Sequence, residues 1–317
     1  MINRTLVRTR VVQTLYAYYQ CGDKTPLTAQ KELLRSFSDT YSLYFMLLAF
    51  VNELTDYANN QISENIARSR ATHTNYKPNR RFVENAFAKQ LFDNRMLRHY
   101  TDDQHLSWEA GNTVFSSIYA QLQEAPYYKQ YMSLPTVTYN DEKQVWRKIM
   151  SELLPSNDDM ISALEELEVA LDHQNWVVDL DIVLSYVVKT IRQFREENGA
   201  DQQLLQMFDN EDELKFAQEL LRQTIAHRDE SLDMVNSHLK NWNADRIAYM
   251  DTIILQTALA ELLYFPEIAL EVTLNEYIEI AKEYSGDKSY LFVNGILNEI
   301  LLELKRSGKL LKALTLK

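Results

Sequence analysis

The chain has 317 residues, of which 46% are hydrophobic and 25% are charged, and this ordinary globular composition excludes a wholly disordered or fibrous protein. It contains six glycines and six prolines, too few for the turns of β-sandwiches and Rossmann-type sheets, so we predict an all-α protein. The net charge of −12 argues against a protein that coats nucleic acid through bulk charge.

The N-terminal part of the chain has helical periodicity. Residues 2–20 repeat apolar side chains at intervals of three and four, which predicts a helix with Arg4 and Arg8 on another stripe. Pro26 is expected to open a second helix that runs toward Tyr57.

The middle of the chain is expected to be helical, with two interruptions. Residues 71–79 lack apolar periodicity and should form a loop. The polar stretch 196–203 contains Gly199 and is the best candidate for a linker. Further helices are predicted over residues 80–98, 104–124, 141–154, 159–172 and 174–195.

The last third of the chain has the clearest pattern. One helix is predicted over residues 212–239, and the next has an apolar face that stops before Pro266. Thr273 and Glu276 have the spacing of a capping box, which predicts the start of another helix. A final helix places apolar side chains from Phe292 onward on one face.

The sequence lacks the motifs of catalysis and metal binding. Its scattered glycines cannot build a phosphate-binding loop, and its histidines have no i, i+4 partner. His227 and Glu230 are best explained as a surface pair, and Cys21, the single cysteine, is expected to pack rather than react. We therefore predict no catalytic residue, no metal, no cofactor and no enzymatic activity.

Nothing in the sequence predicts a membrane protein. The longest apolar run, residues 43–51, has nine residues, whereas a spanning helix needs about 20. Arginines interrupt the apolar residues at the N-terminus, so this segment is not typical of a signal peptide, and an organellar transit peptide is the alternative. We predict a cytoplasmic protein.

Two segments carry chemistry suited to RNA. Arg4, Arg8 and Arg10 on the first helix could contact phosphates. Phe292 could stack on a base while Lys288 and Ser289 hold the backbone. The alternatives are a solvated helix face for the arginines and a core position for the phenylalanine.

Three motifs resemble the bacterial transcription antitermination factors of the NusB family. The first helix leads into V-V-Q-T-L-Y at residues 11–16, after the arginines. Residues 274–282 read L-N-E-Y-I-E-I-A-K, and residues 292–297 read F-V-N-G-I-L. The C-terminal resemblance covers about residues 213–305, and the N-terminal one about 20 residues.

The resemblance implies an all-helical fold of two three-helix bundles and a non-enzymatic function. Such proteins bind boxA-type RNA together with the ribosomal protein NusE and act on the transcription elongation complex. By resemblance, Tyr16 and Asp251 match positions at the NusE interface. The RNA-contacting positions are Arg4, Arg8, Arg10, Lys288, Ser289 and Phe292.

The chain is about twice as long as a usual family member, so we expect an extra helical region within its N-terminal two-thirds. The predicted parts are an N-terminal helix at 1–21, an extra region at 22–200, a NusB-like domain at 201–310 and a tail at 311–317. A basic segment, residues 68–98, contains Tyr76, Phe82, Phe87 and Phe92 and is either a further RNA surface or a charged helix face over a core stripe.

Two other functions remain open at this point. The chain could be a helical scaffold that binds only proteins, through the acidic residues 152–181, which include no Lys or Arg. It could also be an RNA-binding accessory module of an RNA-modifying system, since NusB-like domains occur fused to RNA cytosine methyltransferases.

Overall fold

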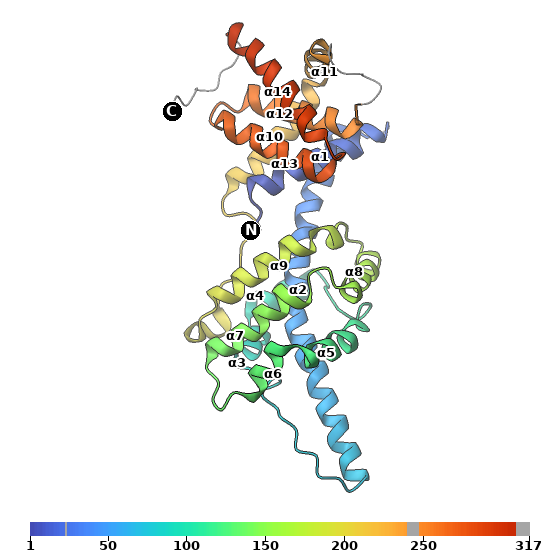
Figure 1. The fold of residues 1–317 in the computed structure, drawn as a ribbon, viewed down its shortest axis with the longest axis vertical. Helices are drawn as coiled ribbons and strands as arrows, with labels where there is room; N and C mark the ends of the chain where they lie inside the picture. Colours follow the sequence, from blue (N-terminus) through green and yellow to red (C-terminus); the bar gives the residue numbers. More distant parts are fainter. Residues whose placement is uncertain (23, 240–246, 309–317) are drawn as a thin grey trace. The chain divides into compact units, whose positions relative to one another are not determined.

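The computed structural model describes residues 1–22, 24–239 and 247–308. Within these residues the regular secondary structure is helical, apart from an isolated parallel bridge between Ile2 and Phe208 (Figure 1). The predicted all-α fold is confirmed. The predicted tail, residues 311–317, lies outside the described residues.

The chain forms two compact units. Unit 1 comprises Met1–Arg35 and Phe208–Lys317, and unit 2 comprises Ser36–Met207. Helix α2 (Pro26–Ala71) begins at Pro26, as the sequence predicts, and contributes residues to both units. The borders of the units differ from the predicted domain borders near residues 22 and 200. Those predicted borders delimit the extra region relative to the family, and they stay a prediction.

Unit 1 is a helical bundle built around α12 (Tyr249–Tyr264), whose side chains from Ile253 to Leu262 are buried on every face. Asn3 starts α1 by accepting a hydrogen bond from the Leu6 N–H at 3.0 Å. The helices that pack on α12 are α1 (Arg4–Gln20), α10 (Glu211–Ala226), α11 (Arg228–Ser237), α13 (Leu270–Tyr284) and α14 (Ser289–Arg306).

Unit 2 contains the remainder of α2 and a set of shorter helices around an aromatic core. Trp108 and Phe115 pack on Phe50 of α2, and Trp146 packs on Phe82. Its α-helices are α3 (Ala86–Phe92), α4 (Arg95–Asp103), α5 (Val114–Glu124), α6 (Pro126–Ser133), α7 (Tyr139–Lys148), α8 (Asp158–Leu171) and α9 (Trp176–Gln193). A π-helical turn, η1 (Ile149–Leu153), follows α7, and a 3₁₀ helix, η2 (Glu196–Asp201), follows α9.

Three predicted helices differ from the observed ones. The predicted helix 80–98 is two helices, because Asn85 and Asn94 each accept a hydrogen bond from the backbone N–H three residues on and so begin α3 and α4. The predicted helix 104–124 begins only at Val114. The predicted helix 212–239 is interrupted at His227.

The predicted linker and the predicted capping box were both wrong. Residues 196–201 form η2 inside unit 2, where Gln90 Nε2 donates to the carbonyl oxygens of Arg195 and Gly199, each at 2.9 Å. Helix α13 begins at Leu270, so Thr273 lies inside it and is buried rather than at its N-cap.

Candidate RNA and partner interface

Arg4 is the most exposed of the three arginines of α1. Its side chain is 38% exposed, and its Nε donates to Glu213 Oε2 of α10 at 3.2 Å. The guanidinium also lies over the ring of Phe216, 4.9 Å from its centroid. These contacts hold Arg4 at the surface of unit 1, with part of its side chain exposed to solvent.

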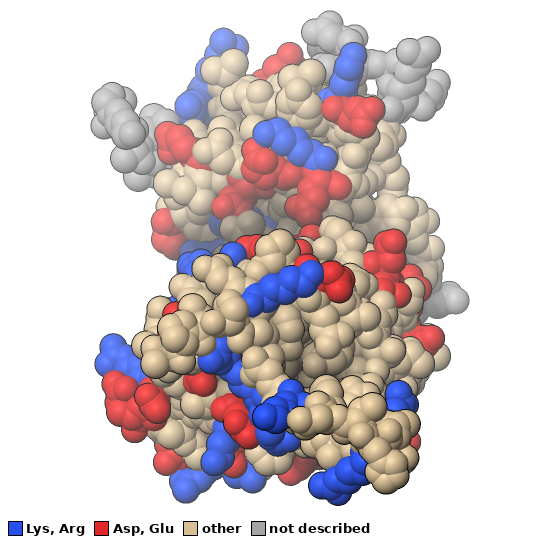
Figure 2. Space-filling model, turned by 60° about the horizontal axis from the view of Figure 1, so that its bottom comes forward, with Lys and Arg blue, Asp and Glu red and all other residues tan. Residues whose placement is uncertain are grey.

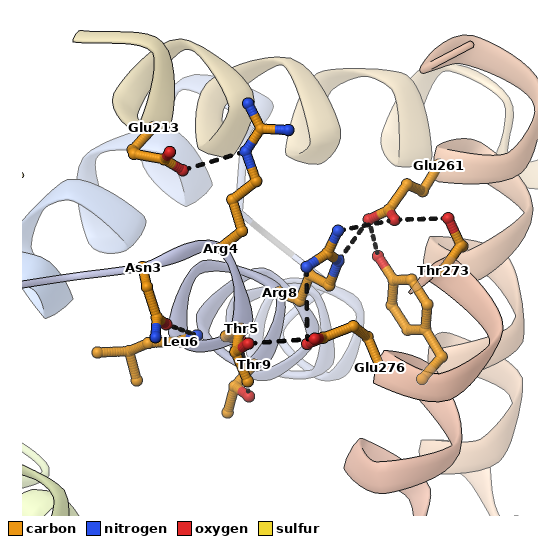
Figure 3. Close-up of polar contacts among 11 residues, drawn as sticks. Asn3, Arg4, Thr5, Leu6, Arg8, Thr9, Glu213, Glu261, Thr273 and Glu276 are labelled. Carbon is orange, nitrogen blue, oxygen red and sulfur yellow. Dashed lines mark hydrogen bonds and ion pairs between the residues drawn. The ribbon is translucent and has the colours of Figure 1, made fainter. Parts of the chain in front are cut away.

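Arg8 lies in the core of unit 1 instead. Its side chain is 2% exposed, and it binds Glu261 in a bidentate pair, with Nε–Oε2 at 2.7 Å and Nη2–Oε1 at 2.9 Å (Figure 3). Glu276 lies 3.6 Å from Arg8 Nη1. Burial by itself lowers the pKa of Arg8, but the hydrogen bond and charge of Glu261 outweigh it and raise that pKa.

Glu261 of α12 accepts hydrogen bonds from two other helices, α1 and α13. Besides Arg8 of α1, Thr273 Oγ1 donates to its Oε1 at 2.8 Å and Tyr277 Oη donates to its Oε2 at 3.1 Å, both from α13. Burial also raises the pKa of Tyr277 well above its ordinary value, so the phenol stays protonated and donates. The cluster therefore joins α1, α12 and α13, and Thr273 serves it rather than capping a helix.

Arg10 is also buried in α1. It is 2% exposed, and its Nη1 donates to Gln13 Oε1 at 2.7 Å. The structure thus gives Arg8 and Arg10 places within the fold of unit 1. Their direct contact with RNA stays a prediction, and Arg4 presents more of its side chain to solvent than either.

The second predicted RNA element is built around a buried carboxylate. Asp251 of α12 is 3% exposed and accepts hydrogen bonds from Ser285 Oγ at 2.6 Å and Ser289 Oγ at 2.9 Å. The two serine hydroxyls are 3.0 Å apart. Asp251 thereby fixes the turn between α13 and α14. Ser285 was not among the predicted site residues.

The predicted RNA residues on this turn differ in exposure. Lys288 is exposed and precedes the first residue of α14, and Ser289 is half-buried. Phe292 is 6% exposed, so its ring lies mainly in the core of the bundle. Stacking of a base on Phe292 stays a prediction, whereas Lys288 and the exposed Leu291 form the outer surface of this turn.

An exposed aromatic pair lies at the predicted partner position. The ring of Tyr16 meets the ring of Tyr249 edge to face, with the centroids 5.8 Å apart, and both side chains are exposed. Tyr16 was a predicted partner residue, whereas Tyr249, the first residue of α12, was not. Exposed aromatic pairs of this kind are common at protein interfaces.

Comparison with known proteins matches the C-terminal part of the chain. Residues 182–301 match the model of the NusB family. A Finegoldia magna protein named transcription antitermination protein NusB is 40% identical over 92 residues, which is 29% of this chain and 67% of that protein. Proteins of the same name from Bacillus subtilis and Bacillus pumilus are both 39% identical, over 70% and 75% of their lengths and 29% and 31% of this chain.

The chain belongs to the NusB family. No solved structure matches it. The names of these NusB relatives are those of a transcription factor, in agreement with the prediction that the chain is not an enzyme. The match to the family model begins in α9 and extends into α14, so it includes Asp251 and the α13–α14 turn.

The basic segment 68–98 lies outside the residues that match the NusB model. Within it, Arg68, Arg80 and Arg95 pair with Glu64, Glu84 and Asp201. Figure 2 shows basic and acidic side chains interspersed over the visible face. The aromatic residues of segment 68–98 differ in exposure: Phe82 and Phe87 are buried, whereas Tyr76 and Phe92 are exposed.

Other chemistry in the described part of this NusB-family chain is limited. Residues 1–22, 24–239 and 247–308 contain no group of three or more His, Cys, Asp or Glu that could hold a metal. None of the described helices is long and apolar enough to cross a membrane. Cys21 is exposed, so the expectation that it packs was wrong, and His227 pairs with Glu230 and stacks on Tyr264.

Proposed function

We propose that this chain is a non-enzymatic transcription antitermination factor of the cytoplasm that binds boxA-type RNA together with the ribosomal protein NusE, within the transcription elongation complex. The observation that carries the proposal is the match of residues 182–301 to the NusB family model, which includes the α13–α14 turn. Relatives at about 40% identity are named transcription antitermination proteins. The acidic net charge of −12 means that RNA must be held by local groups rather than by bulk attraction.

Two cations at the surface of unit 1, Arg4 and Lys288, are the proposed phosphate contacts. Arg4 and Lys288 lie on helices whose positions are fixed by buried polar groups, namely the Glu261 cluster for α1 and Asp251 for the start of α14. The two helices are supported from within the bundle by Arg8 and Arg10 of α1 and by Ser289 and Phe292 of α14. In this proposal, Arg8 and Arg10 contribute to RNA binding by positioning α1.

Tyr16 and Tyr249 are the proposed contact surface for NusE. Their edge-to-face pair is exposed and offers apolar area with hydroxyl groups at its border. Asp251 is buried beneath the α13–α14 turn, so its part in partner binding is to hold that turn.

The test is a titration of fluorescent boxA and scrambled RNAs with the full-length protein, with and without NusE, at several salt concentrations. We expect a preference for boxA that strengthens with NusE. Arg4→Gln and Lys288→Gln should each weaken binding and reduce the slope of log K against log salt by about 0.7, the value for one phosphate contact of a single strand.

Lys215→Gln is the matched control, because Lys215 is an exposed cation of α10 that pairs with Glu211 and lies outside the proposed contacts. It should leave affinity and salt slope unchanged. Equal and negligible binding of both RNAs in the presence of NusE contradicts the proposal.

One observation favours a second candidate function, a scaffold that binds only proteins. Val169 and Val178 are highly exposed in the acidic region 152–181 of unit 2. Apolar side chains surrounded by carboxylates suit a basic amphipathic partner. Binding of NusE without any measurable RNA binding supports this candidate over the first.

A further inference from the structure

A pocket in unit 2 lies between α2 and the start of α3, outside the residues that match the NusB model. Its volume is about 370 Å³. It is lined by Asn52, Thr55 and Asp56 of α2, by Val83 and Glu84, and by Ala88, Lys89 and Phe92 of α3. The spacing of three and four residues places the lining residues of α2 on one helix face, as it does Ala88, Lys89 and Phe92 on α3.

Phe92 forms an aromatic wall of the pocket and is not buried in the core. It is the last residue of α3 and is 53% exposed, in contrast to Phe82 and Phe87 of the same segment, which are buried. Leaving a phenylalanine ring in water is unfavourable by the free energy that its burial would recover. An exposed ring on a pocket wall is therefore available to stack on a planar ligand.

Three polar groups of the pocket have no partner among the described residues. The Oδ1 atom of Asn52 has no hydrogen-bond donor in the described part of the chain. The carboxylate of Asp56 and the ammonium of Lys89 form no ion pair with any described residue. Burial raises the pKa of Asp56, which indicates a carboxylate that is partly withdrawn from water. The pocket thus combines unused acceptors, an unused cation and an aromatic face.

We propose that this pocket binds an unpaired nucleotide, with its base stacked on Phe92, the base amino group toward Asp56 and Asn52, and its phosphate on Lys89. Stacking on an aromatic side chain combined with hydrogen bonds to a base edge is how proteins recognise single-stranded RNA. The proposal rests on the proposed function for RNA as the source of the nucleotide, and it adds a contact in the extra region.

The acceptors of the pocket determine which base it selects. Cytosine, adenine and guanine carry an exocyclic amino group that donates to a carboxylate or an amide oxygen, whereas uracil does not. Cytosine and uracil have rings of the same size, so a comparison between them isolates the amino group from the stacking. We expect cytidine to bind more tightly than uridine.

The experiment measures binding of labelled pentacytidylate and pentauridylate to the full-length protein by fluorescence anisotropy. Wild type should prefer pentacytidylate. Phe92→Ala should weaken its binding by about tenfold, the loss expected for one stacked base, and Phe92→Tyr should restore it. Asp56→Asn should reduce the preference for cytidine, and Lys89→Gln should reduce the salt slope by about 0.7.

Lys129→Gln is the matched charge control, because Lys129 is an exposed cation of α6 in the same unit that does not line this pocket. Far-UV circular dichroism confirms that each variant is folded. Titration with free cytidine monophosphate distinguishes the sources: binding as tight as that of the pentamer assigns the pocket to free nucleotides, and tighter binding of the pentamer assigns it to RNA.

Two results overturn the proposal: no binding of either probe by wild type, or equal binding by wild type, Phe92→Ala and Lys89→Gln. Its failure is distinct from failure of the proposed function. If Phe92→Ala leaves pentamer binding unchanged and the protein keeps its NusE-dependent preference for boxA, only the pocket proposal is contradicted. If wild type shows no preference for boxA but binds the pentamer in a Phe92-dependent way, only the proposed antitermination function is contradicted.

Discussion

Arg8 is an example of a residue whose role depends on a partner far away in the sequence. The pair with Glu261 joins residues 253 positions apart, and both side chains are almost completely buried. An arginine on a helix stripe has the same local sequence whether it faces RNA or the core. Periodicity predicted the helix that carries Arg8, but it could not indicate that Glu261 would withdraw the guanidinium from solvent.

We predict that Arg8→Met lowers the free energy of unfolding by about 3–5 kcal/mol, because it leaves Glu261 buried without its cation. Replacing both partners, as in Arg8→Met with Glu261→Gln, should recover part of that loss, because no uncompensated charge remains. Urea denaturation followed by circular dichroism measures both values.

Arg4 provides the control for this prediction, since its pair with Glu213 is partly exposed. Arg4→Met should change the free energy of unfolding by less than about 1 kcal/mol. A cost for Arg8→Met as small as that for Arg4→Met is evidence against a structural role for the buried pair.

Asparagine caps decide where α3 and α4 of unit 2 begin. Asn94 is fully buried, its side chain accepts from the Leu97 N–H at 2.9 Å, and its Nδ2 donates to the Gln202 carbonyl at 2.8 Å. One side chain therefore starts α4 and ties it to the residues after η2. This explains why the predicted helix 80–98 is divided.

We predict that Asn94→Ala lowers the free energy of unfolding by about 1–2 kcal/mol through loss of the cap. Asn94→Asp keeps the acceptor for the Leu97 N–H but loses the donor to Gln202, so comparison of the two variants separates these roles. Thermal and urea melts measure the difference. A melting curve for Asn94→Ala that matches wild type contradicts the assignment of the cap.

At the level of elements, the sequence predicted most helices but few of their ends. Composition and apolar spacing were sufficient for the all-α fold, for the start of α2 at Pro26 and for the loop before Phe82. Thr273 and Glu276 have the spacing of a capping box, but in the structure Thr273 contacts Glu261 and Glu276 contacts Arg8. The roles of these two side chains are determined by contacts between helices that are distant in the sequence, and no local pattern indicates such contacts.

For the whole molecule, acidity limits non-specific attraction to RNA. The chain has 45 acidic and 33 basic residues and a net charge of −12, with an isoelectric point of about 5.1. Lowering the pH toward the isoelectric point adds protons to the protein, so the net charge rises toward zero. Repulsion between the protein and RNA phosphates then decreases.

We therefore predict that scrambled RNA binds more tightly at pH 5.5 than at pH 7, and that the ratio of boxA to scrambled affinity falls. Anisotropy titrations at the two pH values in low salt measure this. The same pair of titrations at high salt should show a much smaller change, because screening weakens long-range repulsion. Affinity for scrambled RNA that is independent of pH at low salt contradicts the prediction.

The hydrogen bonds that Asp251 accepts from Ser285 and Ser289 join α12 to the first turn of α14. A partner that displaces this carboxylate also displaces Ser289, and with it the neighbouring Lys288. Coupling between two binding sites is reciprocal, so under the proposed function NusE and RNA raise each other's affinity by the same factor. The two effects are then one coupling energy measured from either side, and Ser289→Ala should reduce both by the same amount.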